Sequence, residues 1–220
     1  MGWTLIFTKS VKIKFNLSLF ILLFISIYSG FVSEYLAIFS VLLFHELGHV
    51  LMICLFKGKI KSFEISPMGC FIDFNNINLN KIQRIIVYIS GIVFNLILSF
   101  FLKDAYLLKY NNYLLIFNLL IIYPLDGYRV LEEVLDIFYE KEYLNRLMFI
   151  ISIVCSITFF VLIFYIKYYG YLIILIYLNY KNYINYKSQR LKYKSEFYKN
   201  SFLLNPSVSK WKLKLSSIIF

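Results

Sequence analysis

Apolar stretches about as long as a bilayer is thick recur along this chain of 220 residues. A helix needs about 20 apolar residues to cross the hydrocarbon core of a membrane. Hydrophobic residues make up 60% of the sequence and its mean hydropathy is +0.72, which excludes an ordinary soluble domain. The pattern predicts an all-α polytopic membrane protein. Six transmembrane helices are expected, at residues 15–31, 35–56, 82–102, 113–125, 147–166 and 168–180.

The positive charges indicate how such a chain is oriented. The formal net charge is +11, but Lys and Arg are spread among short loops and the C-terminal tail, so no nucleic-acid partner is expected. With a cytoplasmic N-terminus, all but three of the 23 Lys and Arg residues face the cytoplasm. Cytoplasmic loops carry the excess of positive charge, so both termini are expected there. We expect a six-span domain at 1–180 and a basic tail at 181–220, resting on anionic lipid or a partner surface.

The segment from Lys57 to Asn80 differs in kind from the apolar stretches around it. Polar and apolar residues alternate in Phe63-Glu64-Ile65 and in Phe71-Ile72-Asp73-Phe74, with Pro67 and Gly69 between them. Alternation around a Pro/Gly turn predicts a short β-hairpin between the second and third spans, lying against or dipping into the membrane. Because short alternation is a weak signal, a simple surface loop is the alternative.

The second apolar stretch contains His45-Glu46-Leu47-Gly48-His49, with the only two histidines of the chain. Residues four apart lie on one face of a helix, so both imidazoles can bind one metal ion. Glu46 then lies beside the metal, where it can take a proton from metal-bound water. Two structural core histidines are the alternative. That alternative leaves an ionisable Glu at membrane depth unexplained, and such groups are costly and usually functional.

A carboxylate at the end of the 113–125 stretch supplies a candidate third ligand. Pro124 should end the helix and Gly127 lets the backbone turn, so Asp126 is displayed at a break. By itself Asp126 would be a helix cap or a loop residue, but beside a histidine pair a metal role is favoured. In the predicted orientation, Asp126 and the histidines converge in the cytoplasmic half of the bilayer.

Gly91 and Asn95 lie one turn apart in the third apolar stretch. A Gly allows close approach of two helices, and an Asn at this depth needs a hydrogen-bond partner. Such a pair indicates packing more often than chemistry. We therefore expect both residues, together with Gly127, to support the site, and whether Asn95 also contributes to catalysis is left open.

Taken in order, these motifs resemble the site-2 protease family of intramembrane metalloproteases, peptidase family M50. They are most like its sporulation branch, that of stage IV sporulation protein FB. The similarity extends from the first span to about Asn205. It rests on residues 45–49, Pro67 with Gly69, Gly91 with Asn95, Asn118-Leu119-Leu120, and Pro124-Leu125-Asp126-Gly127.

The resemblance implies one zinc ion per chain, held by His45, His49 and Asp126, with water as fourth ligand and Glu46 as the base. It makes Asn118 and Pro124 candidates for binding the unwound substrate. It also implies that the hairpin from Ile60 to Phe74 pairs with the extended substrate as an added strand. The sequence thus predicts a metalloendopeptidase that cleaves near the cytoplasmic membrane face.

For the sporulation branch, the implied substrate is a sigma-factor precursor of the pro-sigma-K kind, and inhibitory membrane proteins are the implied partners. Two residues depart from the family pattern: Tyr128 replaces the usual second Gly, and Ile121 replaces a Pro expected soon after Asn118. The chain stops at Phe220, so the CBS domain of well-known members is expected to be absent and regulation by ATP is not implied.

Other functions remain open. The same chemistry could act on an anti-sigma factor, a signal-peptide remnant or a peptide pheromone, although the lack of a PDZ domain favours the sporulation-like branch. A metal transporter or metal-binding membrane protein would use the same histidines without needing Glu46. An inactive scaffold is disfavoured because every expected ligand and the base are present. Two His and a carboxylate also suit divalent ions other than zinc.

Overall fold

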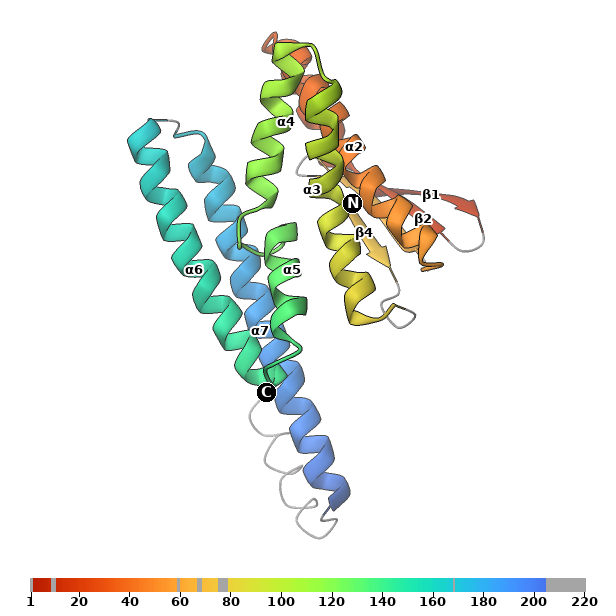
Figure 1. The fold of residues 1–220 in the computed structure, drawn as a ribbon, viewed down its shortest axis with the longest axis vertical. Coiled ribbons are helices and arrows are strands. Elements are labelled where there is room, and N and C mark those ends of the chain that lie inside the picture. The colour runs from red at the N-terminus through yellow and green to blue at the C-terminus, as the bar shows by residue number, and fades with distance from the viewer. Residues whose placement is uncertain are drawn as a thin grey trace. The chain divides into compact units, whose positions relative to one another are not determined.

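The computed structural model describes residues 2–8, 11–58, 60–66, 69–74, 79–167 and 169–204. The chain divides into two compact units, residues 1–137 and 138–220. Helices form most of both units, and a small sheet belongs to the first (Figure 1).

The sheet contains four strands in the order β1-β2-β3-β4. Strands β1 (Gly2–Thr8) and β2 (Val11–Asn16) pair antiparallel, and β2 runs parallel to β3 (Ile60–Ser66). Strand β4 (Gly69–Phe74) pairs antiparallel with β3, with Ser66 opposite Gly69, in the segment where a hairpin was predicted. Pro67 lies outside the described residues. The first two strands were not predicted, and β2 includes Phe15, which was expected to begin the first span.

Five helices complete the first unit: α1 (Leu17–Tyr28), α2 (Val32–Leu55), α3 (Lys81–Phe101), α4 (Ala105–Asn118) and α5 (Asp126–Leu135). Helix α3 begins with a capping box between Asn80 and Gln83. It packs against α2, α4 and α5, and α4 also packs against α2. The histidine motif lies on α2, and α3 packs against both this helix and α5.

The second unit is a pair of helices, α6 (Lys141–Ile166) and α7 (Tyr171–Leu204). Lys167 ends α6 in the left-handed conformation, with φ of 62°. The rings of Phe149 and Tyr186 stack with centroids 4.3 Å apart, and Asn145 Nδ2 donates to the carbonyl of Tyr186. Helix α7 continues well past Tyr180, so the first part of the predicted tail extends the last helix.

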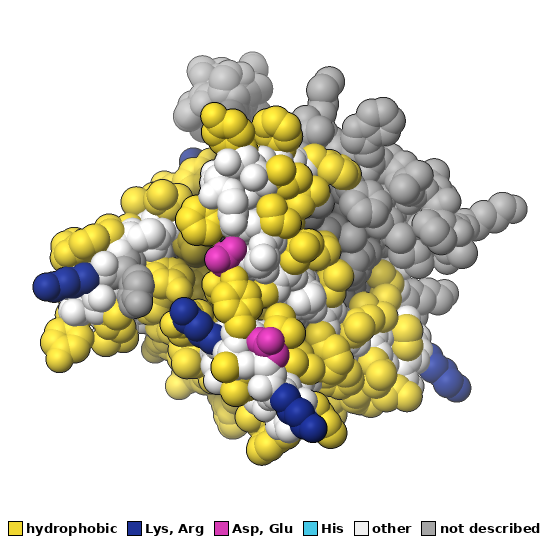
Figure 2. All heavy atoms as spheres, turned by 90° about the horizontal axis from the view of Figure 1, so that it is seen from above, with side chains coloured by type: hydrophobic (Ala, Val, Ile, Leu, Met, Phe, Trp, Pro, Cys, Tyr) yellow, Lys and Arg dark blue, Asp and Glu magenta, His cyan; other side chains and the backbone are white. Residues whose placement is uncertain are grey.

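In the part of the chain that the structure describes, three helices are long and apolar enough to cross a membrane: α2, α3 and α6. Helix α1 has 12 residues and α4 has 14, fewer than the roughly 20 that a span requires. The six-span count therefore stays a prediction. Many large hydrophobic side chains are exposed on these helices, and they cover most of the described surface in Figure 2. Such a surface is suited to lipid rather than water.

Two predicted boundaries were wrong. The fourth apolar stretch, expected at 113–125, begins earlier because Asp104 caps α4 through the backbone N–H groups of Tyr106 and Leu107. It also ends earlier, at Asn118, and residues 119–125 are not helical.

Candidate metal centre

The two histidines lie in the middle of α2, on the face that this helix buries. The four-residue spacing places the imidazoles one turn apart, with ring centroids separated by 4.9 Å. Glu46 follows the first histidine and is also buried. Three titratable side chains are thus withdrawn from solvent on one helix, which is costly unless they bind something.

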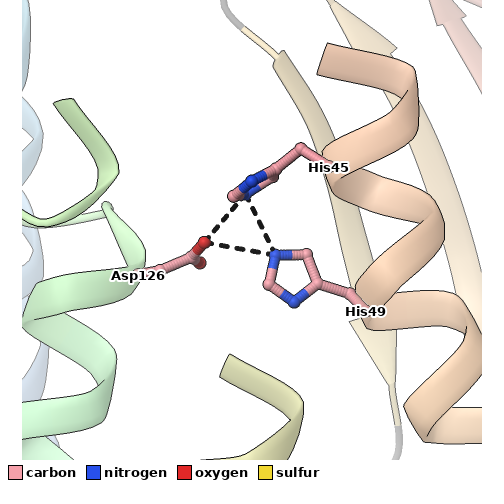
Figure 3. Close-up of side chains that lie close together, drawn as sticks. All are labelled: His45, His49 and Asp126. Atoms are coloured by element: carbon pink, nitrogen blue, oxygen red, sulfur yellow. Dashed lines mark hydrogen bonds and ion pairs between the residues drawn. The ribbon is translucent and has the colours of Figure 1, made fainter. Parts of the chain in front are cut away.

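Asp126 reaches the histidines from a different helix. It is the first residue of α5, directly after the non-helical residues 119–125. Its Oδ2 atom lies 2.9 Å from His45 Nε2 and 3.2 Å from His49 Nε2, and the two Nε2 atoms are 3.2 Å apart (Figure 3). The structure therefore brings together the three residues that the sequence predicts as metal ligands.

The three atoms form a suitable donor set for zinc. Ligand atoms around a tetrahedral zinc ion, with bonds of about 2.0–2.1 Å, lie about 3.3 Å from one another. The observed separations of 2.9–3.2 Å are close to this spacing. Burial alone would raise the pKa of the Asp126 carboxyl, but the two histidines hold that pKa well below its usual range. The carboxylate is the form of this side chain that binds a metal.

The backbone of α3 orients His49. The Nδ1–H of this ring donates to the carbonyl oxygen of Val87 at 2.7 Å, which directs the lone pair of Nε2 toward Asp126 and His45. The Ser90 hydroxyl donates to the same carbonyl. His45 Nδ1 has no hydrogen-bond partner in the part of the chain that the structure describes. The orienting carbonyl was not predicted, because a backbone group leaves no signal in the sequence.

Gly91 brings α3 against both imidazoles. A Cβ atom at this position would lie 2.5 Å from His49 Nε2 and 2.7 Å from His45 Nε2. Asn95, one turn further along, is fully buried, and its side-chain amide has no partner among the described residues. Its backbone carbonyl accepts hydrogen bonds from Asn111 Nδ2 at 2.8 Å and from Ser99 Oγ at 3.0 Å. Gly91 therefore lines the candidate metal site, whereas no hydrogen bond among the described residues joins the Asn95 side chain to it.

We expect Gly91→Ala to weaken metal binding strongly, because the new methyl group displaces both ligand rings. The measurement is the zinc content and zinc affinity of the purified variant. Gly170→Ala is the matched control, since nothing lies within 4 Å of a Cβ atom at Gly170. Unchanged zinc affinity in Gly91→Ala would show that the imidazoles do not bind metal in this geometry.

The remaining predicted residues surround the loop before Asp126. Asn118 ends α4, is buried, and donates to the Leu114 carbonyl at 3.2 Å. Pro124 follows a cis peptide bond, and its carbonyl accepts a bond from Arg129. Gly127 passes so close to Leu119 that a Cβ atom would lie 2.5 Å from the Leu119 carbonyl oxygen. Any side chain at Gly127 would therefore push this loop away.

Tyr128, at the position where the family pattern has a second Gly, is almost completely buried. Its ring packs edge-on against Tyr123 with centroids 5.4 Å apart. The larger residue is thus accommodated by packing against the same loop. The departure from the family pattern leaves the convergence of the three ligand atoms intact.

Comparisons with known proteins found a family match and a similar solved structure. Residues 33–108 match the model of peptidase family M50, a stretch that contains the histidine motif, Gly91 and Asn95 but ends before Asp126. The fold is similar to that of the site-2 protease from Methanocaldococcus jannaschii, with a TM-score of 0.58 at 20% sequence identity. The similarity covers 86% of this chain and 95% of the other. No curated protein matches the sequence. The M50 match and the three apolar helices indicate an integral membrane protein.

Proposed function

We propose that this protein is an intramembrane zinc endopeptidase of the site-2 protease type and belongs to peptidase family M50. The observation that carries the proposal is the convergence of His45 Nε2, His49 Nε2 and Asp126 Oδ2, with Glu46 next to the first histidine. Two imidazoles and one carboxylate leave a fourth position open, which is typical of catalytic rather than structural zinc sites.

The residues divide the chemistry among them. Bound zinc supplies a Lewis acid that polarises the scissile carbonyl and lowers the pKa of water. Glu46 takes the proton of the attacking water and passes it to the leaving amine, the general acid–base role. The hydrogen bond to Val87 keeps His49 in one tautomer and one orientation. Burial of His45, Glu46 and His49, and the low exposure of Asp126 (13% of its side chain), limit the entry of bulk water.

The proposed substrate is a membrane-associated protein cleaved near the cytoplasmic face, a sigma-factor precursor of the pro-sigma-K kind. Asn118 and Pro124, which flank the loop before Asp126, contact the unwound substrate. Strand β4 is at one end of the strand order and contacts α2, which supports pairing with an extended peptide. We also propose that the protein crosses the membrane six times, has both termini in the cytoplasm and is controlled by inhibitory membrane proteins.

Metal removal tests this function directly. Protein purified in detergent is incubated with a membrane-associated sigma-factor precursor, before and after zinc is stripped with a chelator and then restored. We expect a shorter product only when zinc is present. Cleavage by the stripped protein would contradict a zinc mechanism. If the precursor stays intact but an anti-sigma factor is cleaved in a zinc-dependent way, the proposed protease activity stands and the proposed substrate is wrong.

A further inference from the structure

Arg129 is a partly buried cation close to Asp126, and the motifs do not explain its role. It lies three residues after Asp126 on α5, so the two side chains are neighbours on one side of the helix. Among the described residues, no carboxylate lies within ion-pair distance of its guanidinium. A cation in such surroundings needs other partners.

Its partners lie on the loop before Asp126 and on α3. Arg129 Nε donates to the Pro124 carbonyl oxygen at 3.2 Å, two residues before the Asp126 ligand. The guanidinium carbon lies 5.5 Å from the centroid of the Tyr88 ring, within range of a cation–π interaction. Tyr88 directly follows Val87, whose carbonyl orients His49. Arg129 thus connects the loop of one ligand to the turn of α3 that orients another.

Two further ion pairs hold the C-terminal part of α5 against α3. Arg84 forms a two-point ion pair with Glu133, with both N–O distances at 2.8 Å. Lys81 Nζ lies 2.7 Å from the Asp136 carboxylate. These pairs bind the C-terminal turns of α5 to α3. Removal of Arg129 should therefore free the loop before Asp126 while α5 stays packed on α3.

We propose that Arg129 is a positioning residue for the metal centre. It fixes the Pro124 carbonyl against Tyr88 and thereby holds Asp126 at the distance from both histidines that a shared ion requires. This inference rests on the proposed zinc site but not on peptidase activity. The guanidinium suits this role because one group can donate a hydrogen bond to the Pro124 carbonyl while it lies close to the Tyr88 ring.

The test compares zinc affinity in full-length protein in detergent micelles, by competition with a chromophoric chelator. Loss of an outer-shell partner typically costs about 10–100-fold in metal affinity, and we expect this loss for Arg129→Met. The visible spectrum of the cobalt-substituted protein should shift in the same direction as in Asp126→Asn. Arg129→Lys, which keeps the charge but not the planar fork, should lose less.

Arg84→Met is the matched control, since it removes an arginine that joins the same two helices. We expect its melting temperature to fall while its zinc affinity stays within about twofold of wild type, as is usual for a distant site. Wild-type zinc affinity and an unchanged cobalt spectrum in Arg129→Met would overturn the inference and leave the zinc site standing. Equal losses in Arg84→Met and Arg129→Met would also overturn it. If Arg129→Met does not fold, Arg129→Lys decides by the same two measurements. Absence of zinc binding in wild type would refute both the site and the inference.

Discussion

Glu46→Gln is expected to abolish peptide hydrolysis while zinc stays bound. Gln has the shape of Glu but cannot accept a proton, and general acid–base catalysis contributes about 10²–10⁴-fold to a rate. The three ligand atoms come from other residues, so the metal content should remain that of wild type. Cleavage is measured by the size of the product from a membrane-associated substrate, and zinc by elemental analysis of the same preparation.

Glu34→Gln is the control for this variant. It makes the same substitution in the first turn of α2, away from the histidines, and should leave cleavage unchanged. Hydrolysis at the wild-type rate by Glu46→Gln would exclude Glu46 as the base. A Glu46→Gln protein that transports zinc across vesicle membranes as wild type does would instead favour a metal transporter.

Asp126→Asn is expected to lose zinc and activity together. The substitution keeps the volume of the side chain and replaces a carboxylate by a neutral amide, a much weaker zinc ligand. Since loss of an outer-shell partner costs about 10–100-fold in metal affinity, loss of a direct ligand should cost more. The measurement is zinc affinity by chelator competition, followed by cleavage with zinc in excess.

Asp136→Asn is the matched control, because Asp136 caps the other end of the same helix and pairs with Lys81. It should bind zinc as wild type does, with lower thermal stability. If Asp126→Asn binds zinc as tightly as wild type, the contact between Asp126 and the histidines is an ordinary ion pair, and the third ligand must be sought elsewhere.

The three candidate ligands could be selected from the sequence because their signals are local. The spacing of His45 and His49 fixes one helical face, and Pro124 marks the break at which Asp126 is displayed. The roles of Val87 and Arg129 depend on how α3 meets α2 and α5, which no spacing encodes. Arg129 is visible in the sequence only as one charge within a charged segment.

The fold was harder to predict from the sequence, because it also depends on contacts between distant segments. Hydropathy indicated the long helices α2, α3 and α6, but it did not separate the short α4 from the irregular loop that follows it. Residues 11–15 do alternate between apolar side chains and lysine, the pattern of a strand. Their pairing with β3 joins segments about fifty residues apart, and such a long-range contact cannot be predicted from a local pattern.

That pairing also bears on the order in which the protein is assembled. Strand β2 is complete at Asn16, but its parallel neighbour begins at Ile60, after both α1 and α2. During synthesis, the N-terminal hairpin must therefore wait with one edge unpaired until the helix that carries both histidines has been made. Non-local pairings of this kind form late, because the loop between them must close first. The sheet is expected to be completed only after the histidine helix has been placed in the membrane.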